Sequence, residues 1–268
     1  MCGAVMISVI IPTLNEAKTL PLALESITAQ GLPNVEVLVV DSASHDGTRE
    51  ISSQFGAKLL DYPGKPLGAR KQGLMNSTGE FVLLMDADQV LQPGTLNRAL
   101  EAIKDKDMIV LEERSYRTEN WIQRSLDNQK RFMHQRAMKA NGIGLHIYPR
   151  FFRRAILEKA YALIPEELLP SIFVFDDSLL YSKLRSISSG VGMIPDAMLH
   201  IEEKDSFQLI RHNLRLGRNA KAMKAMVTRS SFHQTKSPFE MFVDAAKNRY
   251  LLMSLLKELS FQFGYRFG

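Results

Sequence analysis

Short, unbroken apolar runs alternate with helix-like stretches along the first 111 residues. Five runs have the length and composition of buried strands: Val5–Ile11, Glu36–Val40, Ala57–Leu60, Phe81–Met85 and Met108–Leu111. Helices are expected between them over Glu16–Gln30, Gly47–Phe55, Pro66–Ser77 and Gly94–Lys104. Strands that are apolar on both sides need cover on both faces, and strands separated by helices pair in parallel. The sequence therefore predicts an α/β fold with a mostly parallel, Rossmann-like sheet flanked by helices.

The rest of the chain is less regular. We expect a long helix over Tyr116–Ala140, a turn over Asn141–Leu145, a strand over Ile147–Arg153, a loop over Pro165–Pro170, a short apolar run over Phe173–Phe175 and a helix beginning at Asp176. Two further helices, 207–227 and 238–261, are joined by the Ser/Thr/Pro segment Thr228–Pro238. The expected organisation is a catalytic domain over 1–200, with halves 1–111 and 112–200, and a basic helical C-terminal extension over 201–268.

Positive charge is concentrated in that extension. The chain has 34 Lys and Arg against 29 Asp and Glu, for a net charge of +5. Residues 201–268 hold 12 Lys and Arg against 6 Asp and Glu, so the excess belongs to the last quarter. A nucleic-acid binder, which the pI of about 9.2 permits, is not expected.

Composition excludes several classes of protein. The single cysteine, Cys2, excludes a disulfide framework and any multi-Cys metal site. No apolar run approaches the roughly 18–20 residues that span a bilayer. The apolar start from Met1 to Pro12 has no basic segment and no small-residue cleavage site, so it reads as a strand and not as a secretory signal. We expect a cytoplasmic protein, with the cytoplasmic face of the membrane as a second location.

Three polar loops follow the predicted strands: Pro12–Glu16 (PTLNE), Asp41–Thr48 (DSASHDGT) and Asp86–Gln89 (DADQ). The carboxyl ends of parallel strands meet at one edge of a sheet, where ligands bind. Asp86 and Asp88 supply hard oxygen ligands for Mg²⁺ or Mn²⁺, which keep positions open for phosphate oxygens. The alternative is that this Asp pair caps the next helix.

Other polar and glycine residues, in these loops and in the helix predicted over Pro66–Ser77, have two possible roles each. Asp41 at a strand end can accept hydrogen bonds from a base or a ribose, whereas Asp46 and Thr48 read as turn and helix-cap residues. Arg70 and Lys71 offer cations for phosphate oxygens or form a solvated basic face. A glycine follows them in the same helix, Gly73, and would let that helix approach a ligand or the sheet.

Together these motifs resemble the inverting glycosyltransferases of family 2, which have the GT-A fold. PTLNE, DSASHDGT, GARKQG and GEFVLLMDADQ match, in order and spacing over residues 7–90, the family's IP-x-x-NE opening, VVDD-G-S-x-D-x-T element, AR-N-x-G helix and D-x-D. The chain departs at Ser42, where the family often has Asp, and after Arg70, where Lys71 and Gln72 replace the usual Asn. The first Asp, the Arg and the D-x-D are all retained.

The resemblance implies a role for each matching residue. Pro12, Asn15 and Glu16 match the nucleoside-contacting loop, Asp41 the carboxylate that bonds the base, Arg70 the cation beside the nucleotide, Asp86 the residue near the ribose and Asp88 the metal ligand. The full set expected to bind the donor is Pro12, Thr13, Asn15, Glu16, Asp41, Arg70, Lys71, Gly73, Asp86, Ala87, Arg215 and Arg218. The expected ligands of Mn²⁺ or Mg²⁺ are Asp86, Asp88 and His200.

An acidic pair, Asp176 and Asp177, opens a predicted helix downstream of the D-x-D. The family usually carries such a pair on its acceptor side, and the resemblance implies Asp177 as the general base, with Asp176 beside it. Adjacent carboxylates repel, so at least one is expected to have a raised pKa and to share a proton. The alternative is a helix N-cap stabilised by the helix dipole.

The C-terminal residues are less specific. His200 follows a short apolar stretch, where some family members have an extra metal ligand or diphosphate contact; otherwise it is a structural or surface residue. Arg211, Arg215, Gly217 and Arg218 resemble an R-x-x-x-R-x-G-R segment that closes over the diphosphate or meets an anionic acceptor; the alternative is a solvated basic helix. Apolar residues at helical spacing make Pro238–Phe263 an amphipathic helix, which packs on the domain, on a homodimer partner or on a membrane surface.

These observations predict a metal-dependent, inverting glycosyltransferase. It would move a sugar from a UDP- or GDP-sugar to a glycan or a lipid-linked acceptor. One alternative is a nucleotidyltransferase on a GT-A-like sheet, although the PTLNE loop lacks the Gly-rich phosphate segment of that class. The other is an inactive protein that binds a nucleotide-sugar or a glycan.

Overall fold

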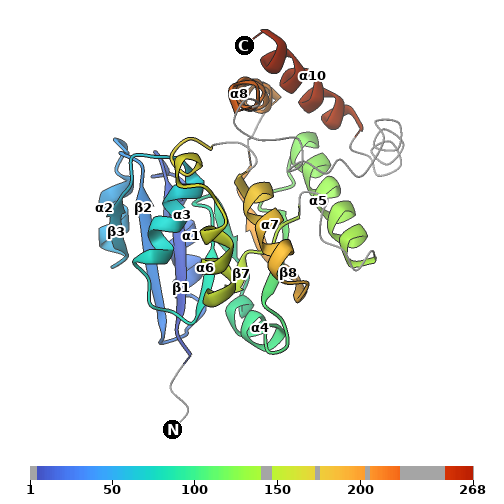
Figure 1. Ribbon diagram of the computed structural model, residues 1–268. Coiled ribbons are helices and arrows are strands. Elements are labelled where there is room, and N and C mark those ends of the chain that lie inside the picture. The colour runs from blue at the N-terminus through green and yellow to red at the C-terminus, as the bar shows by residue number, and fades with distance from the viewer. Residues whose placement is uncertain (1–4, 140–146, 173–175, 203–205, 224–250, 268) are drawn as a thin grey trace. The chain divides into compact units, whose positions relative to one another are not determined.

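A computed structural model describes residues 5–139, 147–172, 176–202, 206–223 and 251–267. They form two compact units, Met1–Glu112 with Tyr148–Leu199, and Glu113–Ile147 with His200–Gly268 (Figure 1). The segment Glu113–Ile147 therefore groups with His200–Gly268, whereas it was expected within the second half, 112–200, of the first domain. The functional division at residue 200 stays a prediction. The expected turn at Asn141–Leu145, the run Phe173–Phe175 and the segment Thr228–Pro238 lie outside the described residues.

The described strands form one sheet. They are β1 (Ile7–Thr13), β2 (Val35–Asp41), β3 (Lys58–Asp61), β4 (Phe81–Leu84), β5 (Gln89–Leu91), β6 (Met108–Ser115), β7 (Phe151–Arg153) and β8 (Val191–His200), in the order β3-β2-β1-β4-β7-β6-β8-β5. β1 runs parallel to β2 and β4, and β2 runs parallel to β3. β7 is antiparallel to both β4 and β6. The expected α/β fold with a largely parallel sheet is confirmed.

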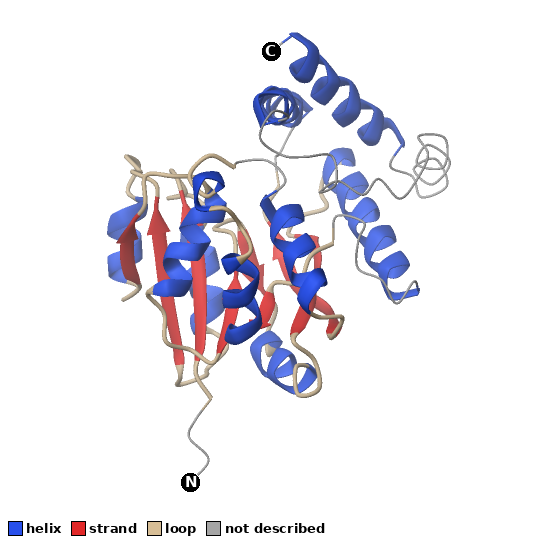
Figure 2. Ribbon diagram, viewed as in Figure 1, coloured by secondary structure: helices blue, strands red, loops and turns tan. Residues whose placement is uncertain are grey.

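Helices cover this sheet on both faces (Figure 2). The first unit contains α1 (Leu20–Thr28), α2 (Thr48–Gln54), α3 (Pro66–Met75), α4 (Thr95–Ala102), α6 (Arg154–Ala162), α7 (Asp176–Ile187) and the short 3₁₀ turn η1 (Glu166–Leu168). The second contains α5 (Trp121–Lys139), α8 (Ser206–Met223) and α10 (Leu251–Phe267). β5, β8 and α6 were not expected, and η1 lies in a stretch that was expected to be a loop.

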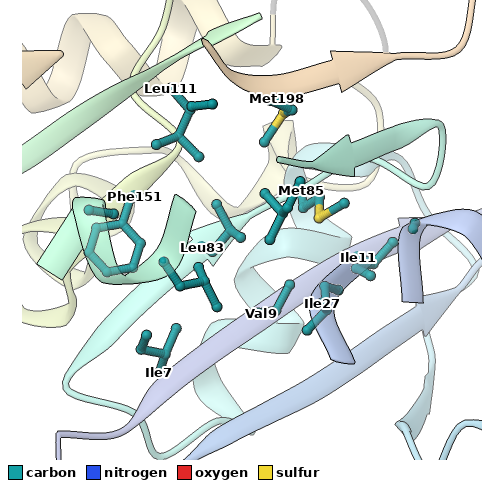
Figure 3. Close-up of a cluster of buried hydrophobic side chains, with 14 of the residues drawn as sticks. Ile7, Val9, Ile11, Ile27, Leu83, Met85, Leu111, Phe151 and Met198 are labelled. Atoms are coloured by element: carbon teal, nitrogen blue, oxygen red, sulfur yellow. The ribbon is translucent and has the colours of Figure 1, made fainter. Parts of the chain in front are cut away.

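The residues of β1 show why the strand runs are unbroken. Ile7, Val9 and Ile11 point to one face, where they join the buried cluster that includes α1 and α4 side chains (Figure 3). Ile10 points to the other face and meets α3 at Gly73, where an added Cβ would overlap Ile10 Cγ2. All residues of β1 except the half-buried Pro12 are thus buried on one side or the other, and apolar side chains are favoured on both faces.

In the second unit, α8 and α10 pack at glycines. A Cβ on Gly217 would overlap the carbonyl oxygen of Phe261, and a Cβ on Gly264 would overlap that of Leu214. The absence of a side chain on both helices allows this close approach. Among the described helices, none combines the length and apolar character that crossing a membrane requires.

Candidate functional site

The loops after β1 and β2 are joined at Asp41. This carboxylate is buried and accepts hydrogen bonds from Thr13 Oγ1 (3.0 Å), from Ser44 Oγ (2.5 Å) and Ser44 N–H (2.9 Å), and from the Arg49 guanidinium (3.1 Å). Burial opposes ionisation, but the hydrogen bonds from Ser44, Thr13 and Arg49 outweigh it and lower the pKa of Asp41. Asp41 is therefore a fixed, charged acceptor at the tip of β2.

Backbone hydrogen bonds hold the PTLNE loop against the DSASHDGT loop. Asn15 has a left-handed backbone (φ 58°), which Asn tolerates better than most residues. Its N–H donates to Ser44 Oγ at 2.8 Å, and its Oδ1 accepts from the N–H of His45 at 2.9 Å. The Glu16 N–H donates to Thr48 Oγ1 at 2.8 Å. The convergence of the first two loops, expected from the parallel sheet, is confirmed.

Glu16 connects this pair of loops to the third. Burial raises the pKa of its carboxyl, and the charges of Asp88, Asp46 and Asp86 raise it further, against a hydrogen bond from Thr19. The strands before the three loops run parallel, with Thr13 paired to Asp41 and Ile10 paired to Leu84, so all three loops leave the same edge of the sheet.

A tight turn forms the D-x-D loop. The Asp86 N–H donates to Gln89 Oε1 at 2.8 Å, and the Gln89 N–H donates to the Asp86 carbonyl at 3.1 Å. Ala87 is buried, and the loop leads into β5. The alternative reading of these Asp residues as a helix cap is wrong, because the next helix begins only at Thr95.

The acidic pair is joined to this loop by Arg70 from α3. Arg70 NH2 lies 2.6 Å from Asp86 Oδ1, while NH1 lies 2.6 Å from Asp176 Oδ2 and 3.0 Å from Asp177 Oδ1. Burial would lower the pKa of this guanidinium, but the charges of Asp177, Asp86 and Asp176 raise it well above its ordinary value. One buried cation thus holds together carboxylates that are 90 residues or more apart in the chain.

Asp176 and Asp177 begin α7, where the helix dipole favours negative charge. The pKa of Asp176 is raised to about 6. Burial is the largest cause, the charge of the neighbouring Asp177 adds to it, and the charge of Arg70 opposes it. This direction agrees with the expectation that the pair contains one carboxyl with a raised pKa. The hydroxyl of Tyr161 on α6 is buried nearby, and burial raises its pKa as well.

Comparison with known proteins identifies the family. The sequence model of glycosyl transferase family 2 matches residues 8–160, which is more than half of the chain. The chain belongs to glycosyltransferase family 2. The match includes all three loops and Arg70, while Asp176 and Asp177 lie beyond it.

Two curated relatives show the range of this family. The chain is 28% identical over 167 residues to the undecaprenyl-phosphate 4-deoxy-4-formamido-L-arabinose transferase of Aeromonas hydrophila, covering 57% of this chain and 50% of that protein. It is 35% identical over 116 residues to the poly(ribitol-phosphate) beta-N-acetylglucosaminyltransferase TarS of Staphylococcus aureus, covering 39% of this chain and 20% of that one. The chain spans about half or less of the length of these relatives.

Solved structures confirm the GT-A fold. TarS residues 1–349 in complex with UDP-GlcNAc superimposes with a TM-score of 0.56 at 18% identity, covering 97% of this chain and 89% of that one. Glucosyl-3-phosphoglycerate synthase from Mycobacterium tuberculosis, in complex with Mn²⁺, UDP and glucosyl-3-phosphoglycerate, gives a TM-score of 0.55 at 16% identity, covering 84% and 81%.

The carboxylates of the D-x-D loop have the chemistry that a hard divalent cation requires. Asp86 and Asp88 supply carboxylate oxygens, the ligands that Mg²⁺ and Mn²⁺ prefer. Within the described residues, no group of three or more His, Cys, Asp or Glu side chains is arranged around one point. Both oxygens of Asp86 are bonded by guanidinium groups, those of Arg70 and Arg150, so the fit is through Asp88, with phosphate oxygens and water as the remaining ligands.

Two helix residues of the expected donor site have protein partners instead. Lys71 forms an ion pair with the exposed Glu166. Gly73 lies against the sheet, with Ile10 on β1 and Val40 on β2 (3.2 Å from an added Cβ) as its neighbours. Of the two readings of Gly73, the packing supports the approach to the sheet.

His200, Arg215 and Arg218 belong to the second unit. His200 Nδ1 accepts a hydrogen bond from Lys130 Nζ at 3.0 Å, and the same ammonium pairs with Glu113 (2.7 Å) and Glu202 (2.6 Å). Arg215 and Arg218 are exposed on α8. The proposed roles of these three residues toward metal and diphosphate stay predictions.

Sequence reasoning missed Arg150. This residue precedes β7, and its NH2 lies 3.2 Å from Asp86 Oδ2 and 3.1 Å from Asp177 Oδ2. The available signal was an arginine in the middle of the expected strand Ile147–Arg153, because a charge at a partly buried position needs a partner. Arg49, which bonds Asp41, was also missed, although its partner is only eight residues away in the chain.

Proposed function

We propose that the chain transfers a sugar from a UDP- or GDP-sugar to a hydroxyl of a glycan or a lipid-linked acceptor, with inversion. The observation that carries this proposal is the Arg70 network. It joins the D-x-D loop, which family resemblance assigns to the donor, to the acidic pair that the same resemblance assigns to the acceptor. Inversion requires the attacking oxygen and the leaving group on opposite sides of the anomeric carbon, so both sets of carboxylates must have fixed relative positions.

On the donor side, Asp41 and Asn15 would contact the nucleoside. Asp88 would hold Mg²⁺ or Mn²⁺ against the diphosphate oxygens, and Asp86 would join it by exchanging one of its contacts with Arg70 or Arg150 for the cation. The cation, when bound, supplies positive charge that stabilises the leaving nucleoside diphosphate. Support comes from the chemistry of the two carboxylates and from the Mn²⁺ and UDP in the Mycobacterium tuberculosis structure.

On the acceptor side, Asp177 would accept the proton of the acceptor hydroxyl. The acceptor oxygen then bonds to the anomeric carbon while the bond from that carbon to the diphosphate oxygen breaks. A general base of this kind contributes roughly 10²–10⁴-fold to the rate. If the acceptor is a lipid phosphate, as the name of the Aeromonas hydrophila relative describes for that enzyme, the oxygen is already ionised and the base contributes less.

We further propose that the protein acts in the cytoplasm, at the surface of the membrane. Leu255, Leu259 and Phe263 recur every four residues along α10 and are 41%, 68% and 59% exposed. Such a stripe is typical of a helix that lies on a lipid surface. A homodimer contact through the same stripe is the alternative.

The proposed function is tested by thermal stabilisation with a panel of UDP- and GDP-sugars, with and without Mn²⁺. A donor that binds only the folded state raises the melting temperature, by an amount that grows with its concentration. We expect Mn²⁺-dependent stabilisation of the wild type, and its loss in Asp88→Ala. Asp105→Ala is the matched control, because Asp105 is an exposed carboxylate paired with Lys106. A wild type that no nucleotide-sugar stabilises would contradict the proposal.

A further inference from the structure

Arg150 has a backbone that the sheet fixes at both of its hydrogen-bonding groups. Its N–H donates to the carbonyl of Ile109 on β6 at 3.0 Å, and its carbonyl accepts from the N–H of Leu84 on β4 at 2.8 Å. The next two residues, Phe151 and Phe152, are buried. Arg150 therefore extends from a rigid position between two strands, unlike a cation on a loop.

The guanidinium of Arg150 closes a ring of alternating charges. It contacts Asp86 Oδ2 at 3.2 Å, and Asp177 at both oxygens, 3.1 Å to Oδ2 and 3.3 Å to Oδ1. Arg70 contacts the other oxygen of Asp86 and also Asp177 Oδ1. Each of these two carboxylates is thus bonded by both guanidinium groups, and the order around the ring is Arg70, Asp86, Arg150, Asp177.

The two arginines of this ring differ in burial and in the carboxylates that they contact. The Arg70 side chain is 4% exposed and also bonds Asp176, so it belongs to the interior. The Arg150 side chain is 15% exposed and contacts both oxygens of Asp177, which fixes the plane of that carboxylate. A planar guanidinium presents a rigid fork to both oxygens of one carboxylate, whereas the single nitrogen of a lysine ammonium does not fix the plane of that carboxylate.

We propose that Arg150 is a positioning residue for transfer: it holds the Asp177 carboxylate in a fixed direction relative to Asp86. This inference rests on the proposed function, in which Asp86 lies on the donor side and Asp177 takes the acceptor proton. A base that turns away from the acceptor still leaves the donor loops intact. Loss of Arg150 therefore affects the transfer step and leaves donor binding largely unchanged.

The test compares Arg150→Gln and Arg150→Lys with Arg153→Gln. Arg153 is the last residue of β7, the strand that Arg150 precedes, but it donates to the backbone carbonyls of Lys106, Ile103 and Lys104, so its loss reports a purely structural effect. Calorimetry gives the donor Kd, and initial rates give kcat for transfer. We expect Arg150→Gln to lower kcat by about 10²-fold, which is the cost of displacing a reacting group by about 1 Å. The donor Kd should stay within about 3-fold of the wild-type value. Arg150→Lys should recover part of kcat.

Three results would overturn the proposal. The first is a kcat of Arg150→Gln equal to that of Arg153→Gln at equal thermal stability, and the second is equal kcat in the Gln and Lys variants. The third is a parallel loss of donor affinity and kcat, which would assign Arg150 to the donor. A wild type that binds donor and transfers sugar, with an unaffected Arg150→Gln, overturns this inference alone; a wild type that binds no donor overturns the proposed function with it.

Discussion

At the scale of single residues, the two carboxylates of the acidic pair have different surroundings and therefore different expected roles. Asp176 bonds Arg70, whereas Asp177 bonds both Arg70 and Arg150. We expect Asp177→Asn to lower kcat for a hydroxyl acceptor by about 10²–10⁴-fold, because the base is lost. Donor affinity measured by calorimetry should stay within a few fold. Near-normal kcat would show either a pre-ionised phosphate acceptor or a different base, and comparing phosphate with hydroxyl acceptors separates the two.

Asp176 gives the site a pH-dependent effect on stability. Its pKa is raised from 3.8 to about 6 by burial and by Asp177, so the folded protein holds this proton more tightly than the unfolded chain does. The resulting stabilisation is complete below pH 4 and is lost as the pH rises through 6. We expect the difference in unfolding free energy between the wild type and Asp176→Asn to become smaller or more negative as the pH is raised from 4.5 to 7. Urea titrations at the two pH values measure this difference; an unchanged difference would contradict the assignment.

The site residues that lie within a sequence motif could be predicted from the sequence. A residue that reaches the site from a distant part of the chain could not. Asp41, Arg70 and Asp86 follow directly from strand ends and from their spacing. Arg150 lies 64 residues from Asp86, and the intervening chain contains no feature that fixes which strand edge it reaches. The pairing of β7 between β4 and β6 supplies that information, and it exists only in the fold.

At the scale of elements, Gly73 sets the distance between α3 and the sheet. An added Cβ would overlap Ile10, so Gly73→Ala forces α3 outward, and overpacking of this kind costs about 1–3 kcal/mol. The gain in helix propensity offsets up to about 1 kcal/mol. We expect a net destabilisation of about 1–2 kcal/mol, measured by urea unfolding. Met75→Ala, at an exposed position of the same helix, should change stability by less than about 0.5 kcal/mol. An Ala variant as stable as the wild type would show that α3 can move freely.

The elements missed from the sequence have local causes. β5 is three residues long, too short for a periodic signal. α6 begins at Arg154 directly after β7 ends at Arg153, so no turn residue marks the boundary. β8 contains Pro195 and a left-handed Asp196, which obscured all but its apolar end. The regular strands β1, β2 and β4 carried clear patterns because both of their faces are buried.

At the scale of the whole molecule, the exposed stripe of α10 predicts lipid binding. Liposome flotation with anionic vesicles should recover the wild type with the lipid, and Leu259→Ser with Phe263→Ser should lose this binding, since each buried apolar side chain contributes to it. Phe55→Ser, at a 40% exposed phenylalanine in the first unit, is the control. Wild type that stays with the soluble fraction, and that sediments as a dimer disrupted by the same substitutions, would assign the stripe to a second copy.

The Arg70 network also constrains the order in which the chain can fold. Arg70 emerges from the ribosome 106 and 107 residues before its partners Asp176 and Asp177, a delay of about 5–20 s at ordinary rates of synthesis. Until α7 arrives, a buried Arg70 would have Asp86 as a nearby counter-charge but would lack the acidic pair, and an under-compensated buried charge is strongly destabilising. We therefore expect α3 to close fully over the early strands only after α7 has been synthesised, so the segment that carries the proposed base is also the one that completes the interior.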